Sequence, residues 1–309
     1  MTEPRFEIHA EGAVYTEFVL DRCRQLIAAA IWNGIAPDQF ESWVNNFRGD
    51  VERYFAACVL DALIYRSEEQ TVALMEHLFQ RSIPDFLADN PPPQVESRDW
   101  AALLRAGPLR RHDPRVRLVP VIRNSDPPTK SGPVLARLYR RRLRLDDRWM
   151  IWPWQVESER RRGVQVFVFV DDFLGSGRQF TSFAQTFDLP RRLRGAMGLY
   201  APLAAHEAGI EAVRRTVPGV HVCAVERLTP EYGLFHPDSR WFRDGRNTPE
   251  AAERFYHNIL HRARVQLPAR FRRGFGRLAV AYSFQHAIPN NCLPLLWFRS
   301  PTWKPLIER

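Results

Sequence analysis

The sequence VQVFVFVDDFLGSGRQF, residues 164–180, is the most informative stretch of the chain. Its apolar residues continue almost without interruption to Val170, a pattern typical of a strand buried on both faces in a parallel sheet. Asp171 and Asp172 follow directly. Open α/β sheets bind ligands at the carboxyl ends of their strands, so we expect these two carboxylates to lie in a ligand site.

A loop of small residues comes next. Gly175, Ser176 and Gly177 permit a tight turn whose backbone N–H groups can converge on an anion. A helix is expected to begin at about Arg178, and a helix N-terminus favours negative charge. Carboxylates beside an anion-binding loop suggest a sugar phosphate, with ribose hydroxyls donating to the carboxylates and the 5′-phosphate held by the loop.

Other nucleotide-binding motifs do not fit this stretch. The chain has no GxxxxGK[ST] loop and no GxGxxG at this turn. Phe173 stands where a haloacid-dehalogenase-type DxD motif needs its second aspartate. A buried strand with an acidic turn and no ligand remains the alternative.

The surrounding sequence, residues 94–309, alternates short apolar runs with helical stretches. This pattern predicts an α/β domain with a mainly parallel sheet flanked by helices. The predicted strands are 116–122, 149–152, 164–170, 196–200, 221–225 and 278–284, and the predicted helices include 133–143, 178–187, 203–216 and 249–264.

The first 90 residues have a different character, because their apolar residues recur at helical spacing. The sequence DNPPP, residues 89–93, cannot continue a helix. We therefore predict an all-helical module at 1–90, joined by a short linker to the α/β domain at 94–309. A role in partner binding or regulation is expected for the module.

Charge divides the chain in a similar way. Residues 1–100 carry a net charge of −9 and residues 101–309 a net charge of +18. The basic part could face the phosphates of a nucleotide or a nucleic acid. However, 42 of the 44 basic residues are Arg, so base composition of the genome is an equally good explanation.

A second loop has features of an anion site. The predicted strand at 116–122 leads into Arg123 and a proline-rich connection that contains Lys130. Ser131 and Gly132 then precede a proline suited to the first turn of a helix. This arrangement predicts another helix N-terminus with cations beside it, although a long exposed connection is the alternative.

A third segment near the C-terminus contains polar residues between prolines. Asn290 and Asn291 lie between Pro289 and Pro294, where a turn is expected, and His286 is close in sequence. Side-chain amides in this position could read the edge of a base. A conventional turn is the competing interpretation.

Residues 164–180 resemble the phosphoribosyl pyrophosphate (PRPP) motif of type I phosphoribosyltransferases, in which two acids precede a Thr-Thr-Gly-type loop. Here Gly175 replaces the first hydroxyl residue and Gln179 the final threonine, whereas Ser176 and Gly177 match. The resemblance implies a type I phosphoribosyltransferase-like fold, PRPP or a nucleotide as substrate, and Mg²⁺ as cofactor. It also implies roles for individual residues: Asp171 and Asp172 in catalysis and in indirect Mg²⁺ binding; Gly175, Ser176, Gly177, Arg178 and Gln179 toward ribose phosphate; Arg123, Lys130, Ser131 and Gly132 toward pyrophosphate; and His286, Asn290 and Asn291 toward a base.

Together with the N-terminal helices, these motifs resemble the phosphoribosyltransferase-like effectors of bacterial conflict systems, including those encoded beside retron reverse transcriptases. The resemblance spans most of the chain and is strongest at 116–180 and 280–306. It implies a nucleotide-directed toxic activity in anti-phage defence. A retron reverse transcriptase with its RNA and DNA is the partner it implies, and a second copy of the chain is another candidate.

Two functions remain open from the sequence. One is an enzyme that transfers or cleaves a group at the anomeric carbon of a ribose phosphate. The other is a non-catalytic module of the same fold that senses a nucleotide or binds nucleic acid. Fold alone does not choose between them.

The sequence also gives expectations about location. No apolar run approaches the ~20 residues of a membrane helix, and the N-terminal sequence MTEPRFEIHAEG has no apolar signal core. We therefore expect a soluble cytoplasmic protein without a membrane partner. Four scattered cysteines without CxxC spacing indicate neither a disulfide framework nor a cysteine zinc site.

Overall fold

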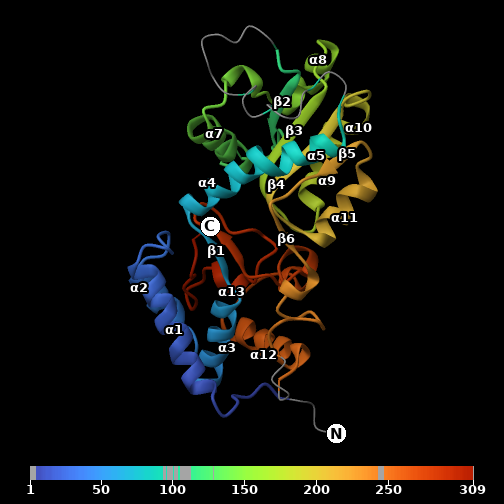
Figure 1. Cartoon of the computed structure of the whole chain (residues 1–309). Coiled ribbons are helices and arrows are strands. Elements are labelled where there is room, and N and C mark those ends of the chain that lie inside the picture. The colour runs from blue at the N-terminus through green and yellow to red at the C-terminus, as the bar shows by residue number, and fades with distance from the viewer. Residues whose placement is uncertain are drawn as a thin grey trace. The chain divides into compact units, whose positions relative to one another are not determined.

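The computed structural model describes residues 5–92, 95, 100, 104, 113–127, 129–242 and 247–308. The chain forms two compact units (Figure 1). Unit 1 combines Met1–Glu69 with Thr229–Arg309, and unit 2 is Gln70–Leu228.

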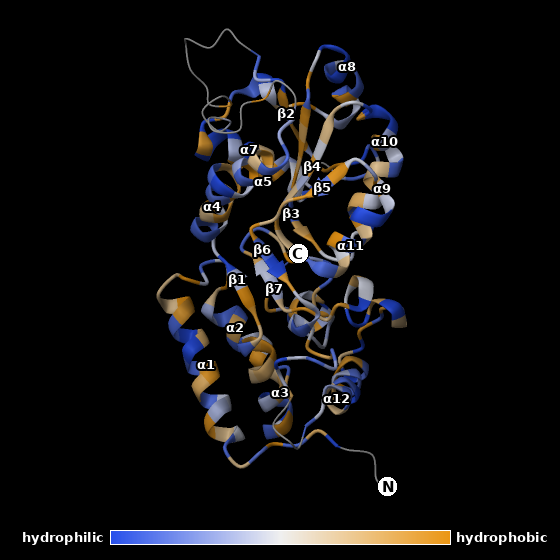
Figure 2. Ribbon diagram, turned by 45° about the vertical axis from the view of Figure 1, so that its right-hand side comes forward, coloured by the Kyte–Doolittle hydropathy of each residue, from blue (hydrophilic) through white to orange (hydrophobic). Residues whose placement is uncertain are grey.

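Unit 2 is built on a parallel five-stranded sheet. β3 lies between β2 and β4, and β4 pairs along its length with β3 on one side and with β5 and β6 on the other. Every residue of β3 is buried, and Figure 2 shows β3 mainly in the colours of apolar residues. The strands are β2 (Val116–Pro120), β3 (Val166–Leu174), β4 (Met197–His206), β5 (Val220–Val222) and β6 (Glu226–Leu228). The predicted α/β fold with a parallel sheet flanked by helices is confirmed.

Alternate residues of each strand point to opposite faces of the sheet. Because the residues on both faces are buried, helices of unit 2 cover the sheet. Phe167 and Phe169 of β3 pack in one fully buried cluster with Phe180 and Phe183 of α9. α7 packs against β2 and β3, and α9 packs against α11. The helices are α4 (Glu68–His77), α5 (Ile83–Asp89), α7 (Ser131–Leu143), α8 (Val156–Arg161), α9 (Arg178–Thr186), α10 (Leu189–Arg192) and α11 (Glu207–Thr216), with a π-helix at Leu78–Ser82 between α4 and α5.

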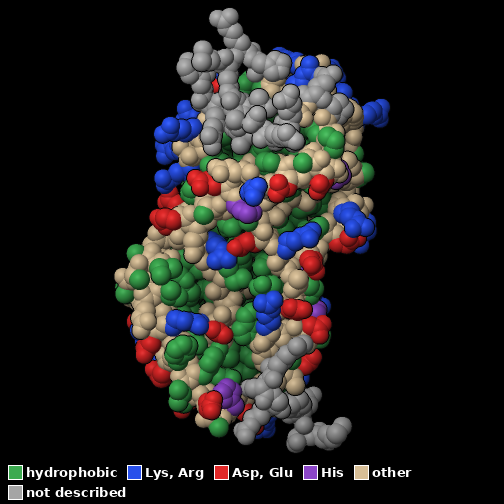
Figure 3. Space-filling model, viewed as in Figure 1, with side chains coloured by type: hydrophobic (Ala, Val, Ile, Leu, Met, Phe, Trp, Pro, Cys, Tyr) green, Lys and Arg blue, Asp and Glu red, His purple; other side chains and the backbone are tan. Residues whose placement is uncertain are grey.

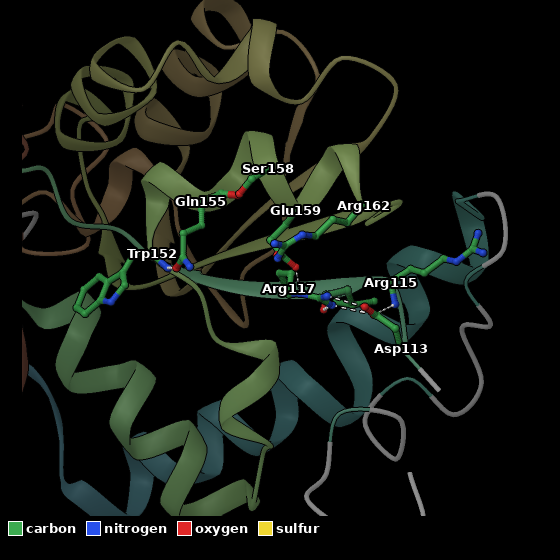
Figure 4. A network of polar contacts seen from close by, with 9 residues as sticks. Asp113, Arg115, Arg117, Trp152, Gln155, Ser158, Glu159 and Arg162 are labelled. Carbon is green, nitrogen blue, oxygen red and sulfur yellow. Dashed lines mark hydrogen bonds and ion pairs between the residues drawn. The ribbon is translucent and has the colours of Figure 1, made fainter. Parts of the chain in front are cut away.

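A buried ion-pair network ties β2 to α8 (Figure 4). The guanidinium of Arg117 donates from Nε to Glu159 Oε2 at 2.7 Å and from Nη2 to Asp113 Oδ2 at 2.6 Å. Breaking such a pair leaves an uncompensated buried charge, which costs about 3–5 kcal/mol. The network therefore holds β2 and the residues just before it against α8.

Several predicted strands differ in detail from the structure. β3 continues through Asp171 and Asp172, and β4 continues to His206, where a helix was expected. Residues 149–152 form no strand, since the chain makes a short helical turn at Asp147–Trp149 and then only one bridge, at Met150, to β2. Asp146 caps this turn by accepting a hydrogen bond from the Arg148 N–H at 3.0 Å.

Unit 1 contains helices and a two-stranded parallel sheet. Its sheet pairs β1 with β7, so the strand predicted at 278–284 is shorter and belongs to this separate sheet. The indole N–H of Trp43 donates to the Leu295 carbonyl oxygen at 2.8 Å, which links the early helices to the C-terminal segment. The elements are α1 (Gly12–Ala28), α2 (Pro37–Val44), α3 (Gly49–Asp61), β1 (Ile64–Arg66), α12 (Pro249–Arg262), β7 (Tyr282–Phe284) and α13 (Pro294–Trp297).

These groupings do not follow the predicted division into 1–90 and 94–309. Residues 1–69 group with the C-terminal segment, and residues 70–90 group with the five-stranded sheet. In unit 2, for example, the ring of Phe79 packs on Tyr139 of α7 with centroids 4.6 Å apart. Helical periodicity identifies an apolar face but not the distant segment that covers it. The partner or regulatory role of residues 1–90 stays a prediction.

Within the described ranges, no helix combines the length and the apolar character needed to cross a membrane.

Candidate functional site

The carboxylate of Asp171 is a hydrogen-bond hub between three elements of unit 2. Its Oδ1 accepts from the Ser131 hydroxyl at 3.0 Å and from the Asp172 N–H at 3.1 Å. Its Oδ2 accepts from the Tyr200 hydroxyl at 3.1 Å and from the Gln179 side-chain amide at 3.4 Å. Asp171 thus joins the first residue of α7, the first turn of α9 and the middle of β4.

The positions of these groups follow from the sheet. Residue alternation puts Asp171 on the same side of β3 as Phe169, which pairs in register with Tyr200 of β4. The ring of Tyr200 stacks on Phe180 of α9 with centroids 3.8 Å apart. Packing therefore fixes the Tyr200 ring and aims its hydroxyl at Asp171.

Burial governs the electrostatics of this hub. Asp171 is only 1% exposed. Burial raises the pKa of its carboxyl well above the ordinary value, and the nearby charge of Asp172 raises it further, whereas the bonds from Ser131, Tyr200 and the Asp172 amide act in the opposite direction. Burial and the neighbouring Asp171 also raise the pKa of Tyr200, so Tyr200 stays protonated and donates.

Asp172 occupies a different environment. Alternation along β3 directs it to the opposite side of the strand from Asp171. It is 8% exposed, and its Oδ1 accepts a hydrogen bond from the Phe173 N–H at 2.8 Å. The two predicted carboxylates are therefore adjacent in sequence but differ in orientation and access to solvent.

The small-residue loop is packed closely on α11. Gly177 has a φ of +80°, and a Cβ built there would lie 2.7 Å from Ala212 Cβ and 3.1 Å from the Gly209 carbonyl oxygen. A Cβ on Gly209 would in turn overlap the carbonyl oxygen of Gly175. Glycines on both sides let the loop and the helix meet backbone to backbone, so the shape of the loop is fixed by packing.

This loop leads into the N-terminus of α9. Helix geometry leaves the first N–H groups of α9 without intrahelical acceptors, and the helix dipole adds partial positive charge there. Ser176 is half-buried, and the exposed Arg178 makes no ion pair with any residue that the structure describes. The arrangement suits an anion such as a phosphate.

A second helix N-terminus meets the same hub. Lys130 is the N-cap residue of α7, and its Nζ lies 3.5 Å from Gln179 Oε1. Gly132 allows a close approach, since a Cβ there would lie 2.7 Å from the Val121 carbonyl oxygen. Lys130, Ser131 and Gly132 are thus brought together with Asp171 and Gln179, and their predicted contact with pyrophosphate stays a prediction.

Arg123 is held elsewhere. Its guanidinium donates to both carboxylate oxygens of Asp126, at 3.1 Å from Nε and 2.7 Å from Nη2, and its backbone N–H donates to Asp126 at 3.0 Å. The bonds between Arg123 and Asp126 therefore hold the loop that follows β2. Among the described residues, Arg123 makes no hydrogen bond to the hub around Asp171. Its predicted contact with pyrophosphate stays a prediction.

The three residues predicted to face a base belong to unit 1. The side-chain amide of Asn291 donates to the Phe275 carbonyl oxygen at 2.7 Å, and the Asn290 carbonyl oxygen accepts from the Phe275 N–H at 2.9 Å. His286 is exposed, and its ring stacks on Phe284 with centroids 5.3 Å apart. The bonds made by Asn290 and Asn291 hold a turn, and the predicted base recognition is untested.

Mg²⁺ binding at this site would depend on its carboxylates. The described residues contain no cluster of three or more His, Cys, Asp or Glu side chains able to hold a metal ion. Both oxygens of Asp171 already accept bonds from protein donors. Mg²⁺ is commonly held by one or two carboxylates together with substrate phosphates, and the residues present match only this indirect mode.

Sequence reasoning missed three contributors to the site. Tyr200 is the polar side chain that completes the hub. Gly209 and Ala212 of α11 are the small residues on which the loop at residues 175–177 packs. A tyrosine in an otherwise apolar strand next to β3 was a usable signal for the first. For Gly209 and Ala212, the run of small residues in AAHEAGIEA, residues 204–212, was a signal in the sequence that a helix and a loop pack closely there.

The family comparison agrees with this geometry. The PRTase-CE family model matches residues 40–309, most of the 309-residue chain and all of the elements that form the hub. Comparison with curated proteins gives no significant match. The extent of the family match and the parallel sheet with its acidic strand end lead to one assignment: the chain is a phosphoribosyltransferase-like protein and belongs to the PRTase-CE family.

Proposed function

We propose that the protein binds the ribose 5-phosphate part of PRPP or of a nucleotide at residues 171–179 and breaks or exchanges the bond at the anomeric carbon. The observation that carries this proposal is the Asp171 hub, which connects the N-termini of α7 and α9. Two helix N-termini at one strand end provide separate positions for two anionic groups. A substrate with a 5′-phosphate and a second phosphate group matches that pattern.

Each group of the site has a defined task in this proposal. The N–H groups at the start of α9, with Ser176 and Arg178, hold the 5′-phosphate. Asp172 accepts hydrogen bonds from the ribose hydroxyls. Asp171 is a positioning residue, because its oxygens are used to hold Ser131 and Gln179 in place. Lys130 and the N-terminus of α7 face the leaving pyrophosphate or an attached phosphate.

In this step the bond from the anomeric carbon to the pyrophosphate or base breaks, the leaving group takes the electron pair, and water or an acceptor forms the new bond to that carbon. Positive charge develops on the ribose ring and negative charge on the leaving group. A carboxylate near the ring stabilises the first charge, and helix N-termini with Lys130 stabilise the second. Mg²⁺ bound to substrate phosphates would supply further stabilisation of the leaving group. Rigid placement of the two ends of the substrate contributes by orienting the reacting bond.

The test is product analysis. Purified protein is incubated with PRPP, nucleoside mono-, di- and triphosphates or cellular RNA, with and without Mg²⁺, and products are identified by mass spectrometry. We expect a product of anomeric cleavage or transfer that is absent with Asp172→Asn. The control is Asp188→Asn, a change at an exposed aspartate in a left-handed backbone conformation that asparagine tolerates. Turnover by Asp172→Asn equal to that of the parent would contradict the assignment.

A second candidate function is supported by two observations. Asp171 is already saturated by protein donors, and Gly175 and Gln179 replace the hydroxyl residues of the usual motif. A module that binds a nucleotide without turning it over needs no free carboxylate. Saturable binding of PRPP or a nucleotide without any product would favour this function over the enzyme.

The biological setting is a further part of the proposal. The motifs that resemble conflict-system effectors support a toxic, nucleotide-directed role in anti-phage defence, with a retron reverse transcriptase as partner. Expression in bacteria of the chain alone and with such a reverse transcriptase tests this role. Growth arrest or phage resistance that disappears with Asp172→Asn is the expected result, and an effect unchanged by that substitution would contradict it.

A further inference from the structure

A pocket in unit 2 lies outside the site described above. Its volume is about 290 Å³, and it lies between α7 and the segment at Met150–Trp152. That segment bridges to β2 at Leu118, on the edge opposite to β3. The walls are mainly apolar, with Pro120, Ala136 and Met150 among them. Asp171 and the side chains bonded to it are not part of this lining.

An exposed pair of tryptophans stands at this pocket. Trp152 lines it and stacks on Trp154, with ring centroids 5.2 Å apart and planes only 8° from parallel. The two residues are 45% and 52% exposed, which is unusual for large apolar side chains. Such an aromatic surface beside an apolar pocket is suited to stacking against another planar group.

The backbone holds the tryptophans in place. The Trp152 N–H donates to the Gln155 side-chain oxygen at 2.8 Å, and the Gln155 N–H donates back to the Trp152 carbonyl oxygen at 2.9 Å. Pro153, between the two tryptophans, is buried. Figure 4 shows the Trp152 indole pointing away from the buried ion pairs of Arg117. Because the backbone is already ordered, stacking a ligand on this surface costs little conformational entropy.

The arginines at the rim of the pocket indicate which planar ligands it can bind. Arg137 lines the pocket, is exposed, and makes no ion pair or hydrogen bond with any described residue. Arg140 lines it as well and pairs at 2.5 Å with Asp147, which is also a lining residue, so these three side chains carry a net charge of +1. Arg192 donates to the Trp154 carbonyl oxygen at 3.5 Å. Figure 3 shows basic side chains gathered over α7. This excess of cations disfavours a cationic ligand and favours an aromatic ring that carries an anion.

We propose that the pocket and the Trp152–Trp154 pair bind a nucleobase by stacking, while Arg137 and Arg140 contact the phosphate attached to it. A free nucleotide and a single-stranded nucleic acid present the same chemistry. Base stacking on exposed aromatics with arginines along the backbone is the usual mode of single-strand recognition. This inference does not depend on the proposed ribose-phosphate chemistry, because Asp171 and Asp172 are not in the pocket lining.

Binding of two probes by the full-length protein tests the proposal. Fluorescence anisotropy measures a labelled oligothymidylate of about 12 nucleotides, and calorimetry measures adenosine 3′-monophosphate, which lacks the 5′-phosphate proposed to bind at residues 171–179. We expect saturable binding of at least one probe, with a dissociation constant raised about tenfold by Trp152→Ala and by Trp154→Ala, since base–aromatic stacking contributes about 1–3 kcal/mol. The probe that binds identifies the source of the base.

Matched controls separate this pocket from other surfaces. Phe18→Ala removes another exposed aromatic, on α1 of unit 1, and Asp188→Asn changes an exposed aspartate of unit 2; both should bind as the parent does. Arg137→Glu, at an exposed position, should also weaken binding and provides a test if a tryptophan variant does not fold. Failure of the parent to bind either probe, or affinities within about twofold of the parent for the folded tryptophan and Arg137 variants, would overturn the proposal.

Discussion

Substitution of Gly177 by alanine should destabilise unit 2 more than the same change at Gly219. Both glycines have nearly the same backbone conformation, with φ of +80° and +82°. A Cβ on Gly219 meets no atom of the described residues within 4 Å, whereas a Cβ on Gly177 lies 2.7 Å from Ala212 Cβ. Gly219→Ala therefore costs about 1–2 kcal/mol for the left-handed conformation alone. Overpacking adds about 1–3 kcal/mol at Gly177.

Thermal unfolding of the two variants measures this difference. One kcal/mol corresponds to about 2–4 °C for a unit of this size, so Gly177→Ala should unfold about 2–12 °C below Gly219→Ala. The displaced loop should also lose affinity for ribose 5-phosphate, while Gly219→Ala retains it. Equal unfolding temperatures for the two variants would refute the argument that backbone contact with α11 fixes the loop.

Three other predictions follow from the hub and the units. Tyr200→Phe keeps the ring stacked on Phe180 but removes the hydroxyl that donates to Asp171. We expect denaturant titration to show a loss of about 1–3 kcal/mol in the free energy of unfolding. An unchanged free energy of unfolding would show that the Tyr200–Asp171 hydrogen bond does not stabilise the unit. Burial raises the pKa of Asp171 in the native state, so this group's contribution to stability falls as the pH rises from its unfolded pKa through its native pKa. The difference between the melting temperature of Asp171→Asn and that of the parent should therefore shift in favour of the variant as the pH rises above the unfolded pKa of about 3.9, and a difference that does not change with pH would contradict the raised pKa. A fragment of residues 94–309 lacks Phe79, which is 1% exposed in unit 2, and lacks residues 1–69 of unit 1; we expect it to be insoluble or unfolded by circular dichroism, and a folded, ligand-binding fragment would favour the division predicted from the sequence.

Much of the α/β unit could be predicted because its determinants are local. The apolar run ending at Val170 identifies a doubly buried strand without any knowledge of its neighbours, and Gly175–Gly177 with the following residues marks a turn into a helix. The acidic pair and the helix N-termini could be located in the same way. Parallel pairing then follows from the alternation of strands with helices.

The remaining features depend on contacts between distant segments. Nothing in the spacing of residues 1–69 shows that Trp43 bonds to Leu295, so the grouping of the two units was not predictable. Tyr200 enters the hub only because β4 pairs with β3 in one particular register.

Calorimetric titration of the full-length protein with PRPP and with ribose 5-phosphate, in the presence of Mg²⁺, tests ribose-phosphate binding most directly. We expect one saturable site per chain that is lost in Asp172→Asn and in Gly177→Val, and kept in Asp188→Asn. Absence of binding by the parent, or affinity unchanged in folded Asp172→Asn and Gly177→Val, would show that residues 171–179 do not form a ribose-phosphate site.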